Sequence, residues 1–280
     1  MAKPTLASVT IVSVCYNSMA VLPSMLASVP DGVRVVVVDN ASTDQAALAA
    51  LAMRPGVHLI HNDDNRGFGV ACNIGAAAVA TEFILFLNPD AELRPDAIET
   101  LLDAMQRYPK ASAMNPRITN ADASPYFKRR SVIMPGSEAM ARGWPDADRE
   151  VTVLTGAALL VRRADFEAVG GFDPAIFLYH EDDDLSRRLR AQCGPIMFIR
   201  GAEVRHLSGH STGRNPATAA FKAWHMGRSR VYAMRKHHRP LAFIRSLVSG
   251  VVQCLSPMSL ISRRKRAKAW AFLRGVISAF

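Results

Sequence analysis

Four acidic residues stand in a row at Glu181–Asp184, within the stretch YHEDDDLSRRL. Leu185 and Leu189 follow at helical spacing, so the run lies where a helix is expected to begin. Carboxylates in a first helical turn are stabilised by about 0.3–1 kcal/mol each against the positive end of the helix dipole. Like charges also raise the pKa of a carboxyl among them, which suits a general base near neutral pH. Both interpretations, a helix start and a catalytic acid, are open.

Two further residues are candidate ligands for a divalent cation. Asp90 ends the stretch FILFLNPD, where a buried strand should stop. Mg²⁺ and Mn²⁺ prefer carboxylate and water oxygens, often completed by substrate phosphates. His206, in the stretch VRHLSGHS, would complete such a site with a neutral imidazole. Each has a plainer interpretation, a capping aspartate before a turn and a structural histidine.

Apolar, β-branched runs alternate with helical stretches in the first third of the chain. We expect strands at Val9–Val14, Val33–Val38, Val57–Ile60 and Phe83–Leu87, helices between them, and another helix over Ala97–Tyr108. Continuous apolar strands separated by helices indicate a sheet that is covered on both faces. The prediction is therefore an α/β fold with a Rossmann-like, mostly parallel central sheet.

Polar residues follow the ends of these expected strands. They are Asn17, Asp39-Asn40, Asn65-Arg66 and Asp90. Because ligands bind outside the carboxyl ends of parallel strands, we expect these side chains to converge on one rim. Asp39 would accept hydrogen bonds from a base or ribose, or cap the next helix. The loop NRGFG offers backbone donors and a cation for phosphate, but it matches neither the P-loop nor the GxGxxG pattern.

The chain has two later segments of different character. Asn115–Glu150 is polar, contains proline and has few periodic signals, so we expect a loop-rich segment over the active face. We place a domain boundary after residue 215, because acids vanish beyond about Gly213 while Lys and Arg remain frequent. Residues 216–280 are expected to form basic amphipathic helices.

An apolar stripe at helical spacing marks this C-terminal segment. It comprises Ile244, Val248, Val251, Leu255 and Met258, and the basic cluster RRKR follows at 263–266. Basic residues beside an apolar stripe favour helices that lie on an anionic membrane surface. The alternative is a helix packed on the core or on a dimer partner, with its basic face in solvent.

The totals bound the class of protein. The chain has 280 residues, and 34 Lys and Arg against 24 Asp and Glu give a net charge of +10. Such a charge attracts an anionic partner: nucleic acid, a phosphorylated ligand or an acidic membrane face. The four cysteines have no metal-site spacing, and the N-terminus shows no secretion signal. We therefore expect a cytoplasmic protein.

Taken in order, these motifs resemble the family-2 glycosyltransferases of GT-A fold, particularly bacterial rhamnosyltransferase-like members. The matching stretches are VTIVSVCYNS (9–18), VVVVDNAS (35–42), NRGFGVACN (65–73), LFLNPD (85–90), TGAALLV (155–161), GGFDPAIFLYHEDDDLSRR (170–188) and HLSGHS (206–211). The resemblance implies inverting transfer of a sugar from a nucleotide diphosphate, dTDP-rhamnose or a UDP-sugar, to a hydroxyl. The acceptor would be a lipid-linked glycan at the inner face of the cytoplasmic membrane, in surface polysaccharide synthesis.

The resemblance also implies a donor pocket. Asp39 would contact the nucleotide base, and the other donor-binding residues would be Asn17, Asn65, Arg66 and Gly67.

It further implies a cation and a base. Asp90 would be the surviving acid of a metal-binding DxD motif, which reads Asn88-Pro89-Asp90 here, and His206 would join it in holding Mg²⁺ or Mn²⁺. In the pair Glu181-Asp182 the catalytic base would be Asp182. Asp183 competes for this role, since the run of acids leaves the register ambiguous.

Two other classes of protein would account for part of this sequence. A sugar-nucleotidyltransferase should carry a glycine-rich phosphate loop after its first strand, where this chain reads CYNS. A nucleic-acid-binding protein would explain the net charge. However, the basic residues concentrate beside apolar stripes in the C-terminal third, and no nucleic-acid motif is present, so we expect no nucleic-acid partner.

Overall fold

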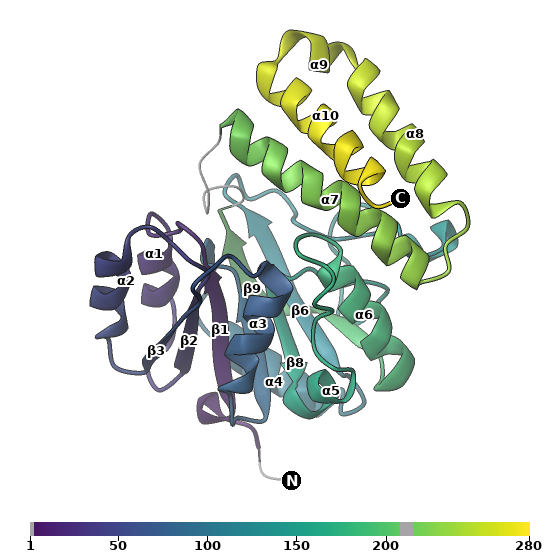
Figure 1. Cartoon of the computed structure of the whole chain (residues 1–280). Helices are drawn as coiled ribbons and strands as arrows, with labels where there is room; N and C mark the ends of the chain where they lie inside the picture. Colours follow the sequence, from purple (N-terminus) through teal and green to yellow (C-terminus); the bar gives the residue numbers. More distant parts are fainter. Residues whose placement is uncertain (1–2, 208–214) are drawn as a thin grey trace.

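The computed structural model describes residues 3–207 and 215–280, except for the side chain of Leu260. Within these residues, nine strands form one mixed sheet in the order β3-β2-β1-β4-β8-β6-β9-β5, and β7 pairs with β9 beside this path. Helices lie on both faces of the sheet, and the C-terminal helices lie above it (Figure 1). The expected α/β fold is confirmed. The end of the motif HLSGHS, from Ser208 on, lies outside the described residues.

The N-terminal half of the sheet is parallel. Its strands are β1 (Val9–Cys15), β2 (Arg34–Asp39), β3 (Val57–His61) and β4 (Phe83–Leu87), and they confirm the four expected strands to within one or two residues. β1 and β4 are buried along their whole length, because helices cover them on both sides. The helices of this half are α1 (Leu22–Ala27), α2 (Gln45–Ala52), α3 (Phe68–Ala77) and α4 (Ala97–Arg107).

The other half of the sheet contains antiparallel strands. β8 (Ala158–Arg162) runs antiparallel to β4 and to β6 (Ala113–Asn120), whereas β6 is parallel to β9 (Ile196–His206). Two short strands, β5 (Ala91–Leu93) and β7 (Arg149–Val151), pair antiparallel with β9. Six strands, β1–β4, β6 and β9, nevertheless share one direction.

The expected loop-rich segment is wrong at its start, because β6 extends to Asn120. Pro116 interrupts the apolar pattern of this strand, so the sequence pattern did not predict it. This proline sits where the register of β6 against β9 shifts, so its missing N–H interrupts the ladder only at an irregularity.

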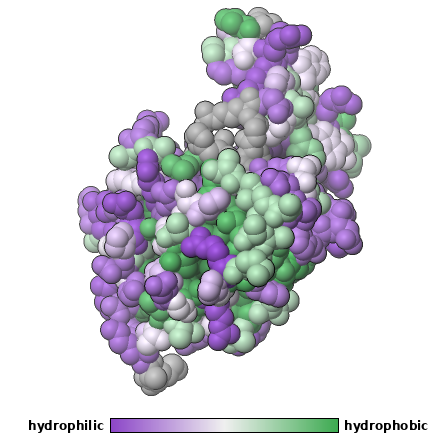
Figure 2. Space-filling view, turned by 90° about the vertical axis from the view of Figure 1, so that its left-hand side faces the viewer, coloured by the Kyte–Doolittle hydropathy of each residue, from purple (hydrophilic) through white to green (hydrophobic). Residues whose placement is uncertain are grey.

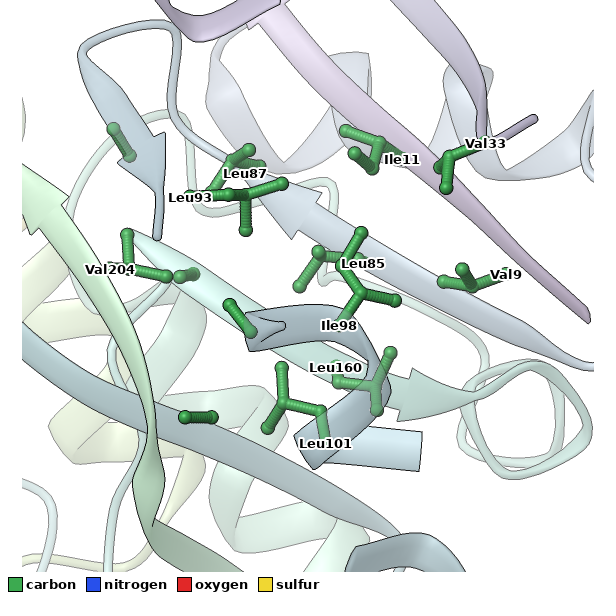
Figure 3. Packing of buried hydrophobic residues seen from close by; sticks show 14 of the residues in the cluster. Val9, Ile11, Val33, Leu85, Leu87, Leu93, Ile98, Leu101, Leu160 and Val204 are labelled. Atoms are coloured by element: carbon green, nitrogen blue, oxygen red, sulfur yellow. The ribbon is translucent and has the colours of Figure 1, made fainter. Parts of the chain in front are cut away.

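Two apolar clusters fill the two faces of the sheet. Side chains of α1, α2 and α4 pack on one face together with β-strand residues. Figure 3 shows Ile98 and Leu101 of α4 beside Leu85 and Leu160 of the sheet. Side chains of α3, α5 (Arg163–Ala168) and α6 (Glu181–Gln192) pack on the other face. The sheet is thereby held rigid, and its strand ends provide fixed positions for polar side chains.

The C-terminal helices are α7 (Pro216–Lys236), α8 (Ala242–Leu255), α9 (Pro257–Ile261) and α10 (Arg263–Ile277). α10 packs closely along α7, because Gly227 of α7 and Gly275 of α10 let the two backbones approach each other. A Cβ at Gly227 would clash with the Phe272 carbonyl oxygen, and one at Gly275 with that of Trp224. In the described parts of the chain, no helix is long and apolar enough to cross a membrane.

Candidate active site

A cavity of about 510 Å³ opens beside the carboxyl ends of the parallel strands; we call it the rim cavity. Polar residues that follow β1, β2, β3 and β4 contribute to its wall: Tyr16, Ser18, Asn40, Asn65, Asn88 and Asp90. Of the side chains that were expected to converge there, Asn40, Asn65 and Asp90 line this cavity. Side chains from α7, among them Phe221 and Lys222, close the opposite side.

The Asn40 side chain connects two loops of the rim cavity. Its Nδ2 donates to Asn65 Oδ1 at 2.8 Å, and its Oδ1 accepts from the Arg66 backbone N–H at 3.0 Å. Gly67 precedes α3 with a φ of +82°, and a Cβ there would clash with the Phe177 carbonyl oxygen. The loop that brings Asn65 and Gly67 to the cavity therefore requires glycine at position 67.

Three residues that the sequence assigned to the donor pocket do not line the rim cavity. Asn17 Oδ1 instead accepts from the Thr43 N–H at 2.9 Å, and the exposed Arg66 side chain lies 3.7 Å from an Asp64 oxygen. Asp39 lies fully buried beneath the rim, and its partners are the Ser42 N–H, Gln45 Nε2 and His61 Nδ1.

Burial raises the pKa of Asp39, but these hydrogen bonds outweigh it and the net shift is downward. Its carboxylate thus joins the end of β2 to the start of α2 and to the end of β3. Its contact with a nucleotide base stays a prediction, as do the donor-binding roles of Asn17 and Arg66.

Asp90 and His206, which are 116 residues apart, meet at the edge of the rim cavity. Because β5 pairs with β9, His206 Nε2 lies 3.1 Å from Asp90 Oδ1, with both side chains buried. The Tyr126 ring packs edge-on against the imidazole at 4.8 Å. One carboxylate and one imidazole suit a divalent cation whose remaining ligands are phosphate and water oxygens. Among the described residues, no third His, Cys, Asp or Glu joins them.

The acidic run occupies the first turn of α6, so the helix-start interpretation is confirmed. The four carboxyl groups nevertheless have different surroundings. Asp184 is buried and pairs with Arg188 on its own helix and with Lys236 and His237 at the end of α7. Burial raises its pKa, but these partners outweigh it and lower the pKa to about 2. Asp184 therefore fastens α7 to the sheet domain.

Lys128, from the loop after β6, pairs with two of the acids. Its Nζ lies 2.6 Å from Asp182 Oδ1 and 2.8 Å from Asp183 Oδ1. Burial lowers the pKa of Lys128, but the charges of the two carboxylates outweigh it and raise the pKa well above its ordinary value. Asp182 Oδ2 also accepts from the Gly156 N–H at 3.1 Å, so this carboxylate is oriented by donors on both oxygens.

Glu181 differs from Asp183 and Asp184, because the pKa values of those two carboxyl groups are lowered. Burial, together with the charge of Asp182, raises the pKa of Glu181 to about 8. Its Oε2 is buried and has no hydrogen-bond partner among the described residues. At neutral pH this carboxyl group is therefore mostly protonated.

A second cavity of about 890 Å³ adjoins the first; we call it the arginine cavity, after Arg130, Arg230, Arg239 and Arg245 in its wall. Asp182 borders both cavities, whereas Asp183 borders the arginine cavity alone. The complete shared wall comprises Tyr126, Thr155, Tyr179, Glu181 and Asp182.

Sequence reasoning did not identify Tyr126, Lys128 or Lys222 as site residues. Tyr126 and Lys128 lie in the long segment that was expected over the active face, and that expectation is confirmed. Lys222 lies in the segment assigned to a separate domain, yet α7 lines both cavities. The only signal for Tyr126 and Lys128 was the length and polarity of their loop, which names no individual side chain.

Comparison with known proteins places this site in context. The model of the family Glycosyl transferase family 2 matches residues 10–170. The N-acetylglucosaminyl-diphospho-decaprenol L-rhamnosyltransferase of Mycobacterium tuberculosis is 35% identical over 241 residues, 74% of this chain and 78% of that protein. Rhamnosyltransferase WbbL of Escherichia coli is 27% identical over 189 residues, covering 61% of this chain and 71% of that protein.

Solved structures agree on the fold. The mannosyltransferase PcManGT from Pyrobaculum calidifontis, in complex with GDP-Man and Mn²⁺, superimposes with a TM-score of 0.56 at 16% identity. The alignment covers 97% of this chain and 85% of that protein. At this identity the likeness concerns the arrangement of sheet and helices alone.

Proposed function

The chain belongs to glycosyl transferase family 2, and from this premise we propose that it is an inverting enzyme with its donor in the rim cavity and its acceptor in the arginine cavity. The observation that carries the proposal is the position of Asp182 in the wall between the two cavities. A base at this place reaches a hydroxyl on one side while a sugar carbon lies on the other.

The proposed reaction is a single displacement. Asp182 takes the proton of the acceptor hydroxyl, the hydroxyl oxygen bonds to the sugar carbon, and the bond from that carbon to the diphosphate breaks. Attack from the face opposite the diphosphate inverts the configuration. Lys128 and the Gly156 N–H hold the carboxylate in one orientation, which is the geometric requirement on a general base. Asp183 is the less favoured base, because it does not border the rim cavity.

Asp90 and His206 are proposed to hold Mg²⁺ or Mn²⁺. When bound, such a cation neutralises charge on the departing diphosphate. PcManGT, of the same fold, is in complex with Mn²⁺ and GDP-Man. Lys222, which lines the rim cavity from α7, adds a positive charge that interacts with the charge of Asp90.

The substrates are proposed from the relatives. Both reported relatives are rhamnosyltransferases, and one acts on an N-acetylglucosaminyl-diphospho-decaprenol. We propose dTDP-rhamnose or a UDP-sugar as donor and a lipid-linked saccharide as acceptor, in surface polysaccharide synthesis at the inner face of the cytoplasmic membrane.

The test is release of nucleoside diphosphate from a panel of UDP-, dTDP- and GDP-sugars, with a prenyl-diphosphate-linked N-acetylglucosamine as acceptor. Turnover of one donor with Mg²⁺ or Mn²⁺, lost with EDTA, is expected. Release that is the same with and without acceptor would contradict transfer to a saccharide hydroxyl.

An anionic membrane surface is the proposed partner of residues 216–280, as a peripheral domain. Five residues of the sequence-predicted stripe, Ile244, Val248, Val251, Leu255 and Met258, are all exposed, between 41% and 75%. The packing alternative within one chain does not account for this exposure. From the side, these helices project from the sheet domain and carry both hydrophilic and hydrophobic surface (Figure 2).

Basic residues near the exposed stripe complement anionic lipid. The cluster Arg263–Arg266 begins α10, and the chain has no acidic residue after Glu203. Leu255→Glu should weaken sedimentation with phosphatidylglycerol vesicles, while Met53→Glu, at an 84% exposed site on the sheet domain, should not. Equal sedimentation of both variants and the unaltered protein would contradict a membrane contact at α8.

A further inference from the structure

The arginine cavity gathers four cationic side chains from separate parts of the chain. Arg130 comes from the loop after β6, Arg230 from α7, Arg239 from the α7–α8 connection and Arg245 from α8. Arg130 and Arg245 are exposed, whereas Arg230 and Arg239 are partly buried. The acids Glu181, Asp182 and Asp183 line the same cavity.

These arginines lack the partners that other partly buried arginines of this chain have. Arg117, Arg188 and Arg190 each pair with a carboxylate at 2.6–2.8 Å. Within the described residues, none of the four cavity arginines forms an ion pair, and the buried Nε atoms of Arg230 and Arg239 have no hydrogen-bond partner.

An unsatisfied buried donor costs about 1–3 kcal/mol, more when it is charged. Burial and the neighbouring charge of Arg245 both lower the pKa of Arg230. Four guanidinium groups without a countercharge therefore form a site that an anion would complete.

The shape of the site restricts the anion. The bound molecule must place a hydroxyl next to Asp182. An uncharged saccharide must therefore lie between the acids and the group that the arginines bind. A diphosphate attached to that saccharide supplies at least two charges and several oxygens, and the planar fork of arginine binds phosphate through two parallel hydrogen bonds. A cavity of about 890 Å³ has room for a sugar and a diphosphate together.

A further, open hollow begins at the arginine cavity. Arg239 also borders this hollow, whose wall includes Leu241, Phe243, Ile244 and Phe280. Leu241 and Phe280 are 64% and 89% exposed, and Ile244 belongs to the exposed stripe of α8. Apart from Arg235 and His238, the rest of the hollow's wall is apolar, and it extends from Arg239 to the exposed stripe of α8, which suits a lipid chain joined to the diphosphate.

We propose that the arginine cavity binds the diphosphate of a prenyl-linked saccharide acceptor, with Arg230 and Arg239 as its principal ligands and Arg130 and Arg245 at its mouth. The inference rests on the proposed function, since it names the acceptor group that this enzyme holds. The phosphate oxygens of an anionic lipid headgroup share this chemistry, so the experiment separates the two sources.

The experiment is titration calorimetry of the full chain with farnesyl diphosphate, in excess nucleoside diphosphate to occupy the rim cavity. We expect farnesyl diphosphate to bind and farnesol to bind at least about tenfold more weakly. Arg230→Gln and Arg239→Gln should each weaken farnesyl diphosphate binding by about tenfold or more. The matched control is Arg228→Gln on the same helix, because Arg228 lies over the Trp224 ring and outside the cavity.

Several outcomes decide the matter. Equal loss of affinity in Arg228→Gln, or unchanged affinity in both cavity variants, overturns the proposal. If Arg230→Gln and Arg239→Gln release the protein from phosphatidylglycerol vesicles but still bind farnesyl diphosphate normally, the arginines contact lipid headgroups and the proposal is likewise overturned. If nucleoside diphosphate does not bind while the arginine dependence holds, the donor assignment fails and the diphosphate site stands.

Discussion

The rim cavity and the arginine cavity share a wall but satisfy their polar groups differently. In the rim cavity the polar side chains pair with one another, as Asn40 does with Asn65 and Asp90 with His206. In the arginine cavity, Arg230 has a buried donor without a partner. Internally paired groups are positioned before a ligand arrives, whereas uncompensated cations gain their partners from the ligand. The proposed donor side is thus preorganised, and the proposed acceptor side would be completed by its substrate.

The largest expected effect concerns the shared wall. Asp182→Asn removes the proposed base and should lower kcat by about 10³-fold, within the usual contribution of a positioned general base. The matched variant is Asp183→Asn, because both carboxylates pair with Lys128 but only Asp182 borders both cavities. We expect Asp183→Asn to lower kcat by less than about tenfold.

Steady-state release of nucleoside diphosphate measures both variants, and donor binding by calorimetry is the control for folding. A larger loss in Asp183→Asn than in Asp182→Asn would transfer the base to Asp183. The base would then lie outside the wall that the two cavities share.

The next effect tests the preorganised side. Asp90→Asn and His206→Ala should each lower turnover by about 10²-fold and raise the Mn²⁺ concentration needed for half-maximal rate. Removal of the cation with EDTA should then reduce the unaltered enzyme to a rate close to that of these variants. Manganese titration of turnover is the measurement. A rate that is unchanged by EDTA in the unaltered enzyme would mean that Lys222, without a cation, offsets the diphosphate charge.

The two cavities also differ in how far the sequence predicts them. Asn40, Asn65 and Asp90 follow apolar strands, and the ends of parallel strands must meet at one edge, so a local pattern is sufficient to place them. Lys128 and Asp182 are 54 residues apart and meet only because a loop without periodicity folds across the sheet. No spacing in the sequence predicts that contact.

Local pattern also did not predict several details, for physical reasons. Asp39 follows a strand as expected, but Ser42, Gln45 and His61 already occupy its carboxylate. The strand β6 was missed because Pro116 interrupts its apolar pattern. Such outcomes depend on which neighbours the fold supplies, and these are not adjacent in the sequence.

A smaller effect, on stability, tests the acid wall of the arginine cavity. Lys128→Met leaves two largely buried carboxylates without their cation and should lower the free energy of unfolding by about 2 kcal/mol at pH 7. Urea denaturation measures the change. The exposed pair of Arg163 and Glu167 provides the control, because Arg163→Met should change stability by less than about 1 kcal/mol. Equal losses in the two variants would contradict a special role for Lys128.

The smallest expected effect concerns Glu181 and the dependence of stability on pH. The pKa of Glu181 is raised to about 8 in the folded chain from an ordinary value of 4.5, so between these values the folded state binds more protons than the unfolded state. Its contribution to stability is therefore complete below about pH 4.5 and is lost as pH rises toward 8. Glu181→Gln, which cannot ionise, should remove a decline on the order of 1 kcal/mol between pH 6 and 8.

Urea denaturation of the unaltered protein and of Glu181→Gln, at a series of pH values, measures this difference. The stability of Glu181→Gln relative to the unaltered protein should be greater at pH 8 than at pH 6. At pH 8 only the unaltered protein must place a buried negative charge at position 181. An equal difference in stability at pH 6 and at pH 8 would mean that Glu181 is already ionised at neutral pH. The wall between the cavities would then carry the charge of Glu181 beside Asp182, and Lys128, which already pairs with Asp182 and Asp183, would not balance it.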